Sequence, residues 1–295
     1  MAASRAFALN FDAEHELAQP HGYQPSQGVV ARFATLATRL GNLLGTSDVI
    51  VTHDTAADSL VNYRGVCWCP TPRALAELRR VGASVPSAPT LDVLQRVHDR
   101  SLGVELDEGP LPSTFVRSIE EAEAAIARSG EAHEFIAKRA FSFAGRGHRT
   151  LTSVLSQADR RFLQNSFALG HGVVIEPKVT RLLDCSLHGL IEQHGNVHFG
   201  RAVVQECDDQ GVWRGLRGEH TSTFAIDLRR DEEAQLLHAA QGVAKALQGI
   251  GYFGPFGIDA FRYQTADGQE MFRPLVEINA RLTMGFFASG LAGML

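Results

Sequence analysis

Two acidic residues near the C-terminal end of the chain have the spacing of a paired carboxylate site. Asp259 and Glu277 lie in two strand-like runs joined by Asp267-Gly268, a dipeptide typical of hairpin turns. A turn centred on that dipeptide places Asp259 opposite Glu277, or within about one residue of it. Asn279 follows two residues after Glu277 and therefore lies on the same face of its strand. The pattern predicts three oxygen-bearing side chains that converge.

Two facing carboxylates repel each other unless a cation lies between them, and two carboxylates with one amide oxygen form a ligand set that suits Mg²⁺. The alternative is that both carboxylates face solvent and pair with Arg262 or Arg281. Pro274 adds a further alternative, because it lacks a backbone N–H and a bulge there would shift the strand register. The sequence alone does not decide between these alternatives.

A lysine followed by a basic loop forms a second candidate site. Lys138 lies in the strand-like run 134–141, and Gly145, Arg146 and Gly147 follow it. Glycine lets backbone N–H groups approach a phosphate, and lysine and arginine neutralise its charge. The pattern indicates a phosphate-binding loop; the alternative is a solvated lysine followed by an ordinary turn.

A third candidate lies where an apolar run ends. The run 173–179 carries Glu176 and Val179, and Asp184 comes shortly after it. A nucleotide pocket needs apolar walls for the base and a carboxylate for the ribose hydroxyls, which these residues can supply. The alternative is that Glu176 and Asp184 are solvated strand ends.

The order of these motifs resembles the ATP-grasp superfamily from about residue 90 to the end. The resemblance is most specific at Gly254-Pro-Phe-Gly-Ile-Asp259-Ala-Phe and at Leu-Val-Glu277-Ile-Asn279-Ala-Arg281. It implies that Asp259, Glu277 and Asn279 hold Mg²⁺ on the phosphates of ATP. It also implies two ATP-grasp lobes that clasp the nucleotide.

The same resemblance assigns the remaining site residues. Lys138 is expected to reach the nucleotide, the loop with Gly145, Arg146 and Gly147 to close over the phosphates, and Arg100 to stand where the family has a second lysine. In the adenine pocket, Glu176 and Val179 would meet the base and Asp184 the ribose.

The resemblance further implies an ATP-dependent carboxylate–amine ligase that forms an acyl phosphate and releases ADP, in which Lys138 acts at the reacting groups. Arg281 is our candidate to hold the substrate carboxylate or the acyl phosphate, because a planar guanidinium suits that task and strand alternation places Arg281 beside Asn279. The expected cofactors are ATP with Mg²⁺, two ions being predicted and Mn²⁺ being a substitute. The expected partners are a small-molecule carboxylate and an amine, neither of which the sequence identifies. Two alternatives stay open, namely an ATP-grasp kinase that uses a hydroxyl acceptor and a catalytically silent ATP-binding regulatory protein.

The elements that must position these residues indicate an α/β (α+β) chain. We predict a small Rossmann-like α/β domain over 1–88, a lobe with Lys138 and the glycine loop over 89–180, and a lobe with the metal site over 181–295. The predicted helices and strands are listed together: helices at 26–44, 72–82, 91–102, 118–130, 157–169 and 231–248, and strands at 48–53, 114–117, 134–141, 173–179, 185–193, 197–206, 257–264 and 271–279.

Composition limits the function classes. The formal charge of −5 and the pI near 6.2 give no general attraction to nucleic acid or to a membrane surface, and no long apolar run indicates a membrane span. Four cysteines at irregular spacing indicate reduced, buried thiols rather than a disulfide framework or a zinc site. We therefore expect a cytoplasmic protein, with a homodimer left open.

One acidic cluster lies outside these motifs. Asp12, Glu14 and Glu16 occur close together near the N-terminus. They could bind a cation or a substrate amine, or they could form a solvated acidic face.

Overall fold

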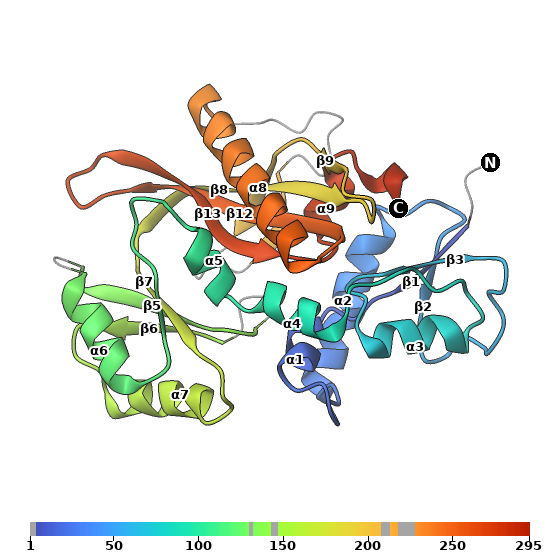
Figure 1. Ribbon diagram of the computed structural model, residues 1–295, viewed down its shortest axis with the longest axis horizontal. Helices are drawn as coiled ribbons and strands as arrows, with labels where there is room; N and C mark the ends of the chain where they lie inside the picture. The colour runs from blue at the N-terminus through green and yellow to red at the C-terminus, as the bar shows by residue number, and fades with distance from the viewer. Residues whose placement is uncertain (1–3, 130–131, 143–146, 208–212, 218–227) are drawn as a thin grey trace.

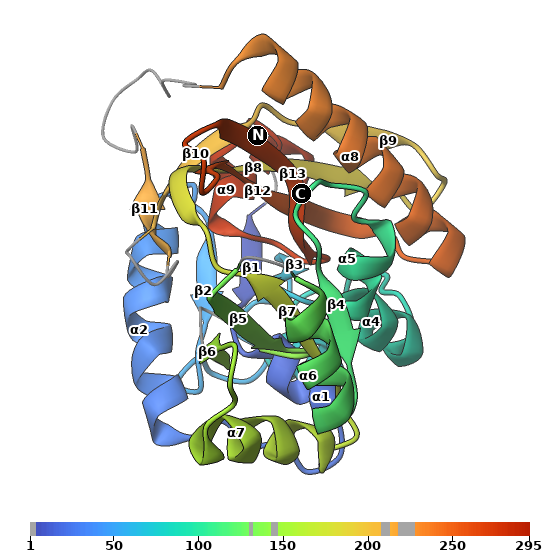
Figure 2. The same ribbon diagram turned by 90° about the vertical axis from the view of Figure 1, so that its left-hand side faces the viewer.

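The computed structural model describes residues 4–129, 132–142, 147–207, 213–217 and 228–295. It contains three separate β-sheets with helices packed against them (Figure 1). The ATP-grasp lobes predicted from the sequence correspond to two sheets that face each other. In Figure 2 the larger C-terminal sheet lies above the smaller one, with a long helix above the first and two helices below the second.

The N-terminal part forms a three-stranded parallel sheet in the order β2-β1-β3. Its elements are β1 (Arg5–Ala8), α1 (Ala13–Ala18), α2 (Gln27–Gly41), β2 (Val49–Val51), β3 (Arg64–Cys67) and α3 (Pro72–Arg80). The run 48–53 indicates a buried strand, but this prediction is wrong, because β2 is an edge strand and its three residues are half-buried. The label Rossmann-like goes beyond what three parallel strands establish, so it stays a prediction.

The middle part forms a four-stranded antiparallel sheet in the order β4-β7-β5-β6. Its elements are β4 (Thr114–Val116), α6 (Ile119–Arg128), β5 (Glu134–Arg139), β6 (His148–Thr152), α7 (Gln157–Phe167) and β7 (Val173–Pro177). Alternate residues such as Phe135, Ala137 and Ile175 pack under α6 and α7. Because strand side chains alternate between faces, the residues between them point to the opposite side, toward the C-terminal sheet.

The C-terminal part forms a six-stranded sheet in the order β11-β10-β8-β12-β13, with β9 paired to β8. Its elements are β8 (Thr180–Ile191), β9 (Val197–Phe199), β10 (Val203–Cys207), β11 (Trp213–Leu216), α8 (Arg230–Ile250), β12 (Gly254–Gln264), β13 (Glu270–Asn279), α9 (Met284–Ala288) and a 3₁₀ turn (Ala292–Met294). α8, together with α4 (Leu91–His98) and α5 (Ser101–Leu106), covers one face of this sheet through a continuous apolar core. These helices do not cover the other face of the sheet, where the candidate site lies.

Two predicted elements are divided in the structure. The helix predicted over 91–102 breaks at Asp99, whose carboxylate accepts a hydrogen bond from the Ser101 backbone N–H at 2.8 Å. Aspartate favours such local capping over a helix interior. The strand predicted over 197–206 is two strands, because Arg201 donates its N–H to the Ser289 carbonyl outside the sheet and the pairing with β8 shifts by one residue between β9 and β10. Strands β1, β3, β6 and β11 and helices α1 and α9 were not predicted.

The predicted hairpin is present, and it carries the bulge that Pro274 could introduce. Gln264 pairs with Glu270 beside the turn, and beyond a register shift Asp259 pairs directly with Glu277. The shift lies between Asp259 and Phe261 on β12, opposite the segment of β13 that contains Pro274. The bulge therefore preserves the predicted facing pair.

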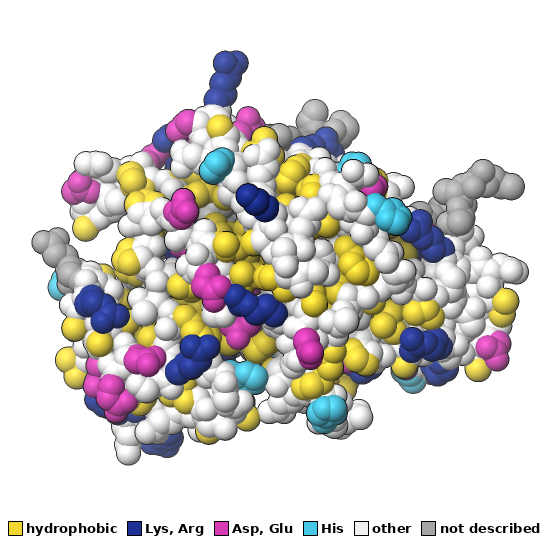
Figure 3. Space-filling model, in the orientation of Figure 1, with side chains coloured by type: hydrophobic (Ala, Val, Ile, Leu, Met, Phe, Trp, Pro, Cys, Tyr) yellow, Lys and Arg dark blue, Asp and Glu magenta, His cyan; other side chains and the backbone are white. Residues whose placement is uncertain are grey.

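None of the helices in the described residues is long and apolar enough to cross a membrane. On the face shown in Figure 3, Lys and Arg side chains are interspersed with Asp and Glu. Of the cysteines, Cys67, Cys69 and Cys185 are free and buried, as the sequence predicts. The predicted division at 88 and 180 stays a prediction, although α4 and α5 pack with the C-terminal sheet.

Candidate active site

The acidic row lies on β12 and β13, on the face of the C-terminal sheet that α8 does not cover. Asp259 and Glu277 are direct cross-strand partners, and Asn279 is the partner of Gly257 two residues further along. The Asn279 amide donates to Asp259 Oδ2 at 2.9 Å. Ile258 and Ala260, which alternate with Asp259, lie in the apolar core under α8. This core fixes the direction in which the row points.

The two carboxylates differ in their electrostatic state. Burial, and then the charge of Glu277, raises the pKa of Asp259 to about 6. Burial also acts to raise the pKa of Glu277, but Arg100 and Lys138 outweigh it, so that this pKa is lowered. Repulsion between facing carboxylates is therefore present in the structure, and a divalent cation would relieve it.

Gln205 is a member of this row that the sequence did not reveal. Its amide donates to Asp259 Oδ1 at 2.8 Å from the neighbouring part of the sheet, where β10 pairs with β8. The described residues contain no group of three or more His, Cys, Asp and Glu side chains arranged for a metal. The candidate set is instead two carboxylates with an amide, which is a set of hard oxygen donors.

Neither of the two arginines offered as alternative partners is paired with these carboxylates. Arg262 makes a bidentate pair with Glu232 of α8, at 2.6 and 2.7 Å, on the opposite face of the sheet. Arg281 pairs with Glu14 at 2.5 Å. Glu277 is bound instead by a cation from outside the sheet.

That cation is Arg100, at the N-terminal end of α5. Arg100 Nη2 donates to Glu277 Oε1 at 2.5 Å, and Arg100 Nη1 donates to the Arg139 carbonyl and to Ser142 Oγ, each at 2.6 Å. The break in the predicted helix at Asp99 is what places Arg100 here. A single side chain thus joins the acidic row to the end of β5.

Two further basic side chains come from the middle sheet. Lys138 on β5 and His148 on β6 are cross-strand partners, so their side chains share the face opposite α6 and α7. Lys138 is 4% exposed and forms an ion pair with Glu176, which is 2% exposed. The alternatives of a solvated lysine and a solvated Glu176 are therefore wrong. Burial lowers the pKa of Lys138.

Glu176 has a second partner, Arg273 of β13, which the sequence analysis missed. Arg273 Nη1 lies 3.0 Å from Glu176 Oε2, and Arg273 also pairs with Asp107 at 2.6 Å. Burial acts to raise the pKa of Glu176, but Lys138 and then Arg273 outweigh it and lower the pKa to about 2. The pair Glu176–Arg273 joins the two facing sheets directly.

An apolar surface adjoins these charges. Val179 packs with Leu111, Phe261 and Tyr263 in a small cluster of its own. Asp184 lies on β8, opposite Gln205 and Phe261, and pairs with Arg181 at 2.8 Å. The structure thus places Val179 and Asp184 near one end of the acidic row, where an apolar wall meets a carboxylate.

The N-terminal acidic cluster also belongs to this region. Asp12, Glu14 and Glu16 are all at least nine-tenths buried, so a solvated acidic face is wrong. Arg73 pairs with Asp12 and Glu16, whereas Glu14 binds Arg281. Arg281 therefore joins the end of β13 to α1.

Several polar atoms around the acidic row are buried without a hydrogen-bond partner in the described part of the chain. They are Glu14 Oε2, Arg100 Nε and His148 Nε2, whereas a fourth such atom, Arg139 Nε, lies on the side of β5 that packs against Phe162 of α7. Burial, followed by nearby Arg100 and Lys138, lowers the pKa of His148 to about 3. Unsatisfied buried groups are rare in native proteins, so atoms of this kind concentrated in one place fit a site that binds a charged ligand.

Of the predicted glycine loop, Gly145 and Arg146 lie outside the described residues. Gly147 has a φ of +80°, and a Cβ there would lie 2.9 Å from Ser142 Cβ. Both facts require glycine at this position. Its carbonyl accepts the backbone N–H of Arg139 at 3.0 Å.

The same architecture occurs in solved structures of proteins named as synthetases. D-cycloserine synthetase DcsG is 17% identical, with a TM-score of 0.56 over 99% of this chain and 96% of that one. D-alanyl-alanine synthetase A from Vibrio cholerae is 13% identical, with a TM-score of 0.53 over 95% and 90%. N5-carboxyaminoimidazole synthetase from Staphylococcus aureus, complexed with ADP, is 16% identical, with a TM-score of 0.52 over 96% and 72%.

The chain has the ATP-grasp fold. The fold predicted from the C-terminal motifs is thereby confirmed. No protein-family model and no curated protein matches the sequence. In ATP-grasp terms, the two facing sheets are the lobes, and the charged residues described above lie where the lobes meet.

Proposed function

We propose that this chain is an ATP-dependent ligase that joins a carboxylate to an amine and releases ADP and phosphate. The observation that carries the proposal is the Asp259–Glu277 pair with Asn279 beside it, facing the cations Arg100 and Lys138. An anionic row opposite a group of cations suits a metal–triphosphate complex. The similar structures support the same class, since their names are those of synthetases and one of them is complexed with ADP.

In this proposal each site residue has a separate task. Asp259, Glu277 and Asn279 would hold Mg²⁺, which supplies neutralisation of phosphate charge when bound. Arg100, Lys138 and the loop that ends at Gly147 would bind the phosphates. Glu176, Val179 and Asp184 would contact the adenosine. The ion pairs of Arg100 and Lys138 with carboxylates would then be exchanged for pairs with phosphate.

The reaction would occur in two displacements. A carboxylate oxygen of the acid attacks the γ-phosphorus, the bond from that phosphorus to the bridging oxygen of ADP breaks, and an acyl phosphate forms. The amine nitrogen then attacks the acyl carbon, phosphate leaves, and the nitrogen loses a proton. Arg281 would hold the acid or its acyl phosphate, because its planar guanidinium can bind two oxygens at once.

Glu14 gives this end of the site a negative charge beside Arg281. Its Oε1 binds Arg281 and its buried Oε2 has no partner among the described residues. An ammonium group would satisfy that oxygen, so a substrate that carries both a carboxylate and an ammonium group would meet both charges.

The test is ADP release with Mg·ATP across a panel of carboxylic and amino acids, with hydroxylamine as a surrogate amine. Wild type is compared with Glu277→Gln and with Glu270→Gln, a control on the same strand whose partner is the exposed Arg229. The proposal expects hydroxamate from at least one acid, lost in Glu277→Gln and kept in Glu270→Gln. ADP without hydroxamate would favour a hydroxyl kinase, and ATP binding without ADP would favour a silent regulatory protein.

A further inference from the structure

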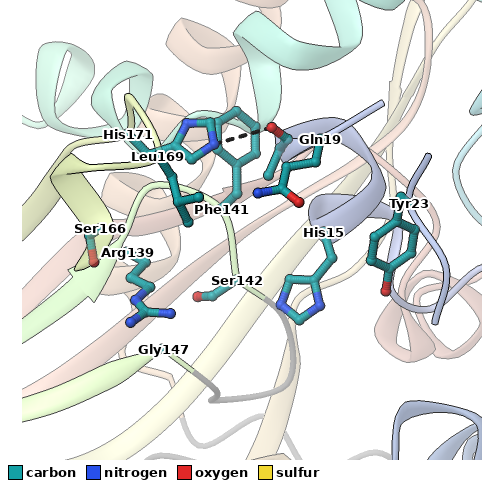
Figure 4. Close-up of a pocket in the computed structure, with 11 residues that line it drawn as sticks. His15, Gln19, Tyr23, Arg139, Phe141, Ser142, Gly147, Ser166, Leu169 and His171 are labelled. Atoms are coloured by element: carbon teal, nitrogen blue, oxygen red, sulfur yellow. Dashed lines mark hydrogen bonds between the residues drawn. The ribbon is translucent and has the colours of Figure 1, made fainter. Parts of the chain in front are cut away.

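A pocket lies between α1 and the middle lobe, next to the site described above. It holds about 370 Å³ and has polar and aromatic walls. Figure 4 shows His15, Gln19 and Tyr23 on the side of α1. The lining residues of the lobe are Arg139, Phe141, Ser142, Gly147, Ser166, Leu169 and His171. At about 30 Å³ per water molecule, the pocket has room for a ligand group of several heavy atoms.

The charge of this pocket is positive. Among the described residues that line it, Arg139 is the one arginine and none is acidic. The Arg139 guanidinium carbon lies 4.7 Å from the centroid of the Phe162 ring, and Nε is buried without a partner in the described chain. A guanidinium that stacks on a ring by its face presents its N–H groups at the edge, which suits a carboxylate or a phosphate.

The other polar groups of the lining are largely engaged. The Tyr23 hydroxyl donates to Asp12 at 2.7 Å, the Ser166 hydroxyl donates to the Phe162 carbonyl at 3.0 Å, and His171 Nε2 lies 3.2 Å from the Ala18 carbonyl, to which it donates. These bonds hold the walls in place. They leave Arg139 as the charged group available to an incoming ligand.

The pocket connects to the reacting end of the site through two residues. Ser142 lines the pocket, and its hydroxyl accepts a hydrogen bond from Arg100, which binds Glu277. On the opposite wall, His15 directly follows Glu14, which binds Arg281. The pocket is therefore one side chain away from Arg100, and one residue along α1 from Glu14.

We infer that the pocket takes the non-reacting end of the acid substrate, and that this end carries a second anionic group, a carboxylate or a phosphate, which Arg139 binds. The inference rests on the proposed function, because it takes the occupant to be that substrate. The rings of Phe141 and Tyr23 would flank the carbon chain that joins the two ends. The predicted substrate class is a small acid with two anionic ends.

The test is isothermal titration of the full chain, without nucleotide, with three probes. Glutarate and 3-phosphonopropionate carry a second anionic end, whereas pentanoate matches glutarate without it. Arg139→Gln is compared with Arg117→Gln, a control in which another guanidinium, 4.8 Å from the Phe115 ring, is removed from the same lobe. Ala18→Phe, which fills the pocket from the α1 side, is a second variant that leaves Arg139 intact.

The expected result is that at least one dianion binds wild type about tenfold or more tightly than pentanoate, because a charged hydrogen-bonded pair is gained. Arg139→Gln should lose this preference, Arg117→Gln should keep it, and Ala18→Phe should weaken the binding of the dianion. The dianion that is preferred distinguishes a carboxylate end from a phosphate end.

The inference is overturned if pentanoate binds as tightly as both dianions, if Arg139→Gln keeps the preference, or if neither dianion binds below about 10 mM. A failure of this pocket assignment can be distinguished from a failure of the proposed function. A preference that depends on Arg139 would support the pocket even without ADP release. Hydroxamate formation without the preference would support the ligase and reject this pocket assignment.

Discussion

Replacing Asp259 with asparagine is expected to stabilise the ligand-free protein at neutral pH, although it removes a predicted metal ligand. Burial, and then the charge of Glu277, raises the pKa of Asp259 from 3.8 to about 6 in the folded protein. A carboxyl whose pKa is raised on folding contributes stability that is complete below its unfolded pKa and is lost as the pH rises through the folded value. The charged form of Asp259 therefore opposes folding above about pH 6.

The size of the effect follows from this pKa difference. A shift of about 2 units at about 1.4 kcal/mol per unit corresponds to about 3 kcal/mol at neutral pH. This is an upper limit, because Gln205 and Asn279 donate hydrogen bonds to the carboxylate. For a chain of this size, about 3 kcal/mol corresponds to a rise in Tm of about 5 °C.

The assay is thermal unfolding of the Asp259→Asn variant and wild type in EDTA, at about pH 7.5 and about pH 5. The gain in Tm should be present at the higher pH and should shrink at the lower one, where Asp259 is largely protonated in the wild type. Glu270→Gln on the same strand serves as the control. A loss of Tm at the higher pH, or a gain that is independent of pH, would refute the reasoning.

Three further predictions concern basic side chains of the site. Lys138→Met should lower the free energy of unfolding in urea by less than Glu176→Gln does. Glu176 keeps its pair with Arg273 in the first variant, whereas Lys138 and Arg273 both lose their shared partner in the second. The reverse order would contradict this pairing. Arg281→Lys should lower kcat about tenfold or more with little change in the KM for ATP, since an ammonium cannot bind two oxygens as a fork; equal losses in both would reject that role. His148→Gln should leave the acid limb of the pH–rate profile in place, because the pKa of His148, at about 3, keeps it neutral; loss of a titration near pH 6.5 would contradict that value.

The acidic row could be predicted from the sequence because its geometry is local. Asp267-Gly268 marks the turn, and alternation along the two strands then sets which side chains face each other. The bulge opposite Pro274 changed the pairing near the turn but kept Asp259 opposite Glu277. The order of the motifs along the chain supplied the fold.

The partners of these residues could not be predicted, because they depend on packing between distant segments. Arg100 and Glu277 are 177 residues apart in sequence, and Arg281 and Glu14 are 267 apart. Arg273 had one local signal that could have found it, namely a charge within the otherwise apolar run Met271-Phe-Arg-Pro-Leu275. Such a charge is expected to have a buried partner.

The central claim is that the acidic row binds a metal that is held together with ATP. The most direct measurement is calorimetric titration of ATP with and without Mg²⁺, on wild type, Glu277→Gln and Glu270→Gln. The account predicts that Mg²⁺ strengthens ATP binding in wild type and in Glu270→Gln, and that this dependence is lost in Glu277→Gln. ATP affinity that is insensitive to Mg²⁺ in wild type, or a Mg²⁺ dependence that survives in Glu277→Gln, would contradict it.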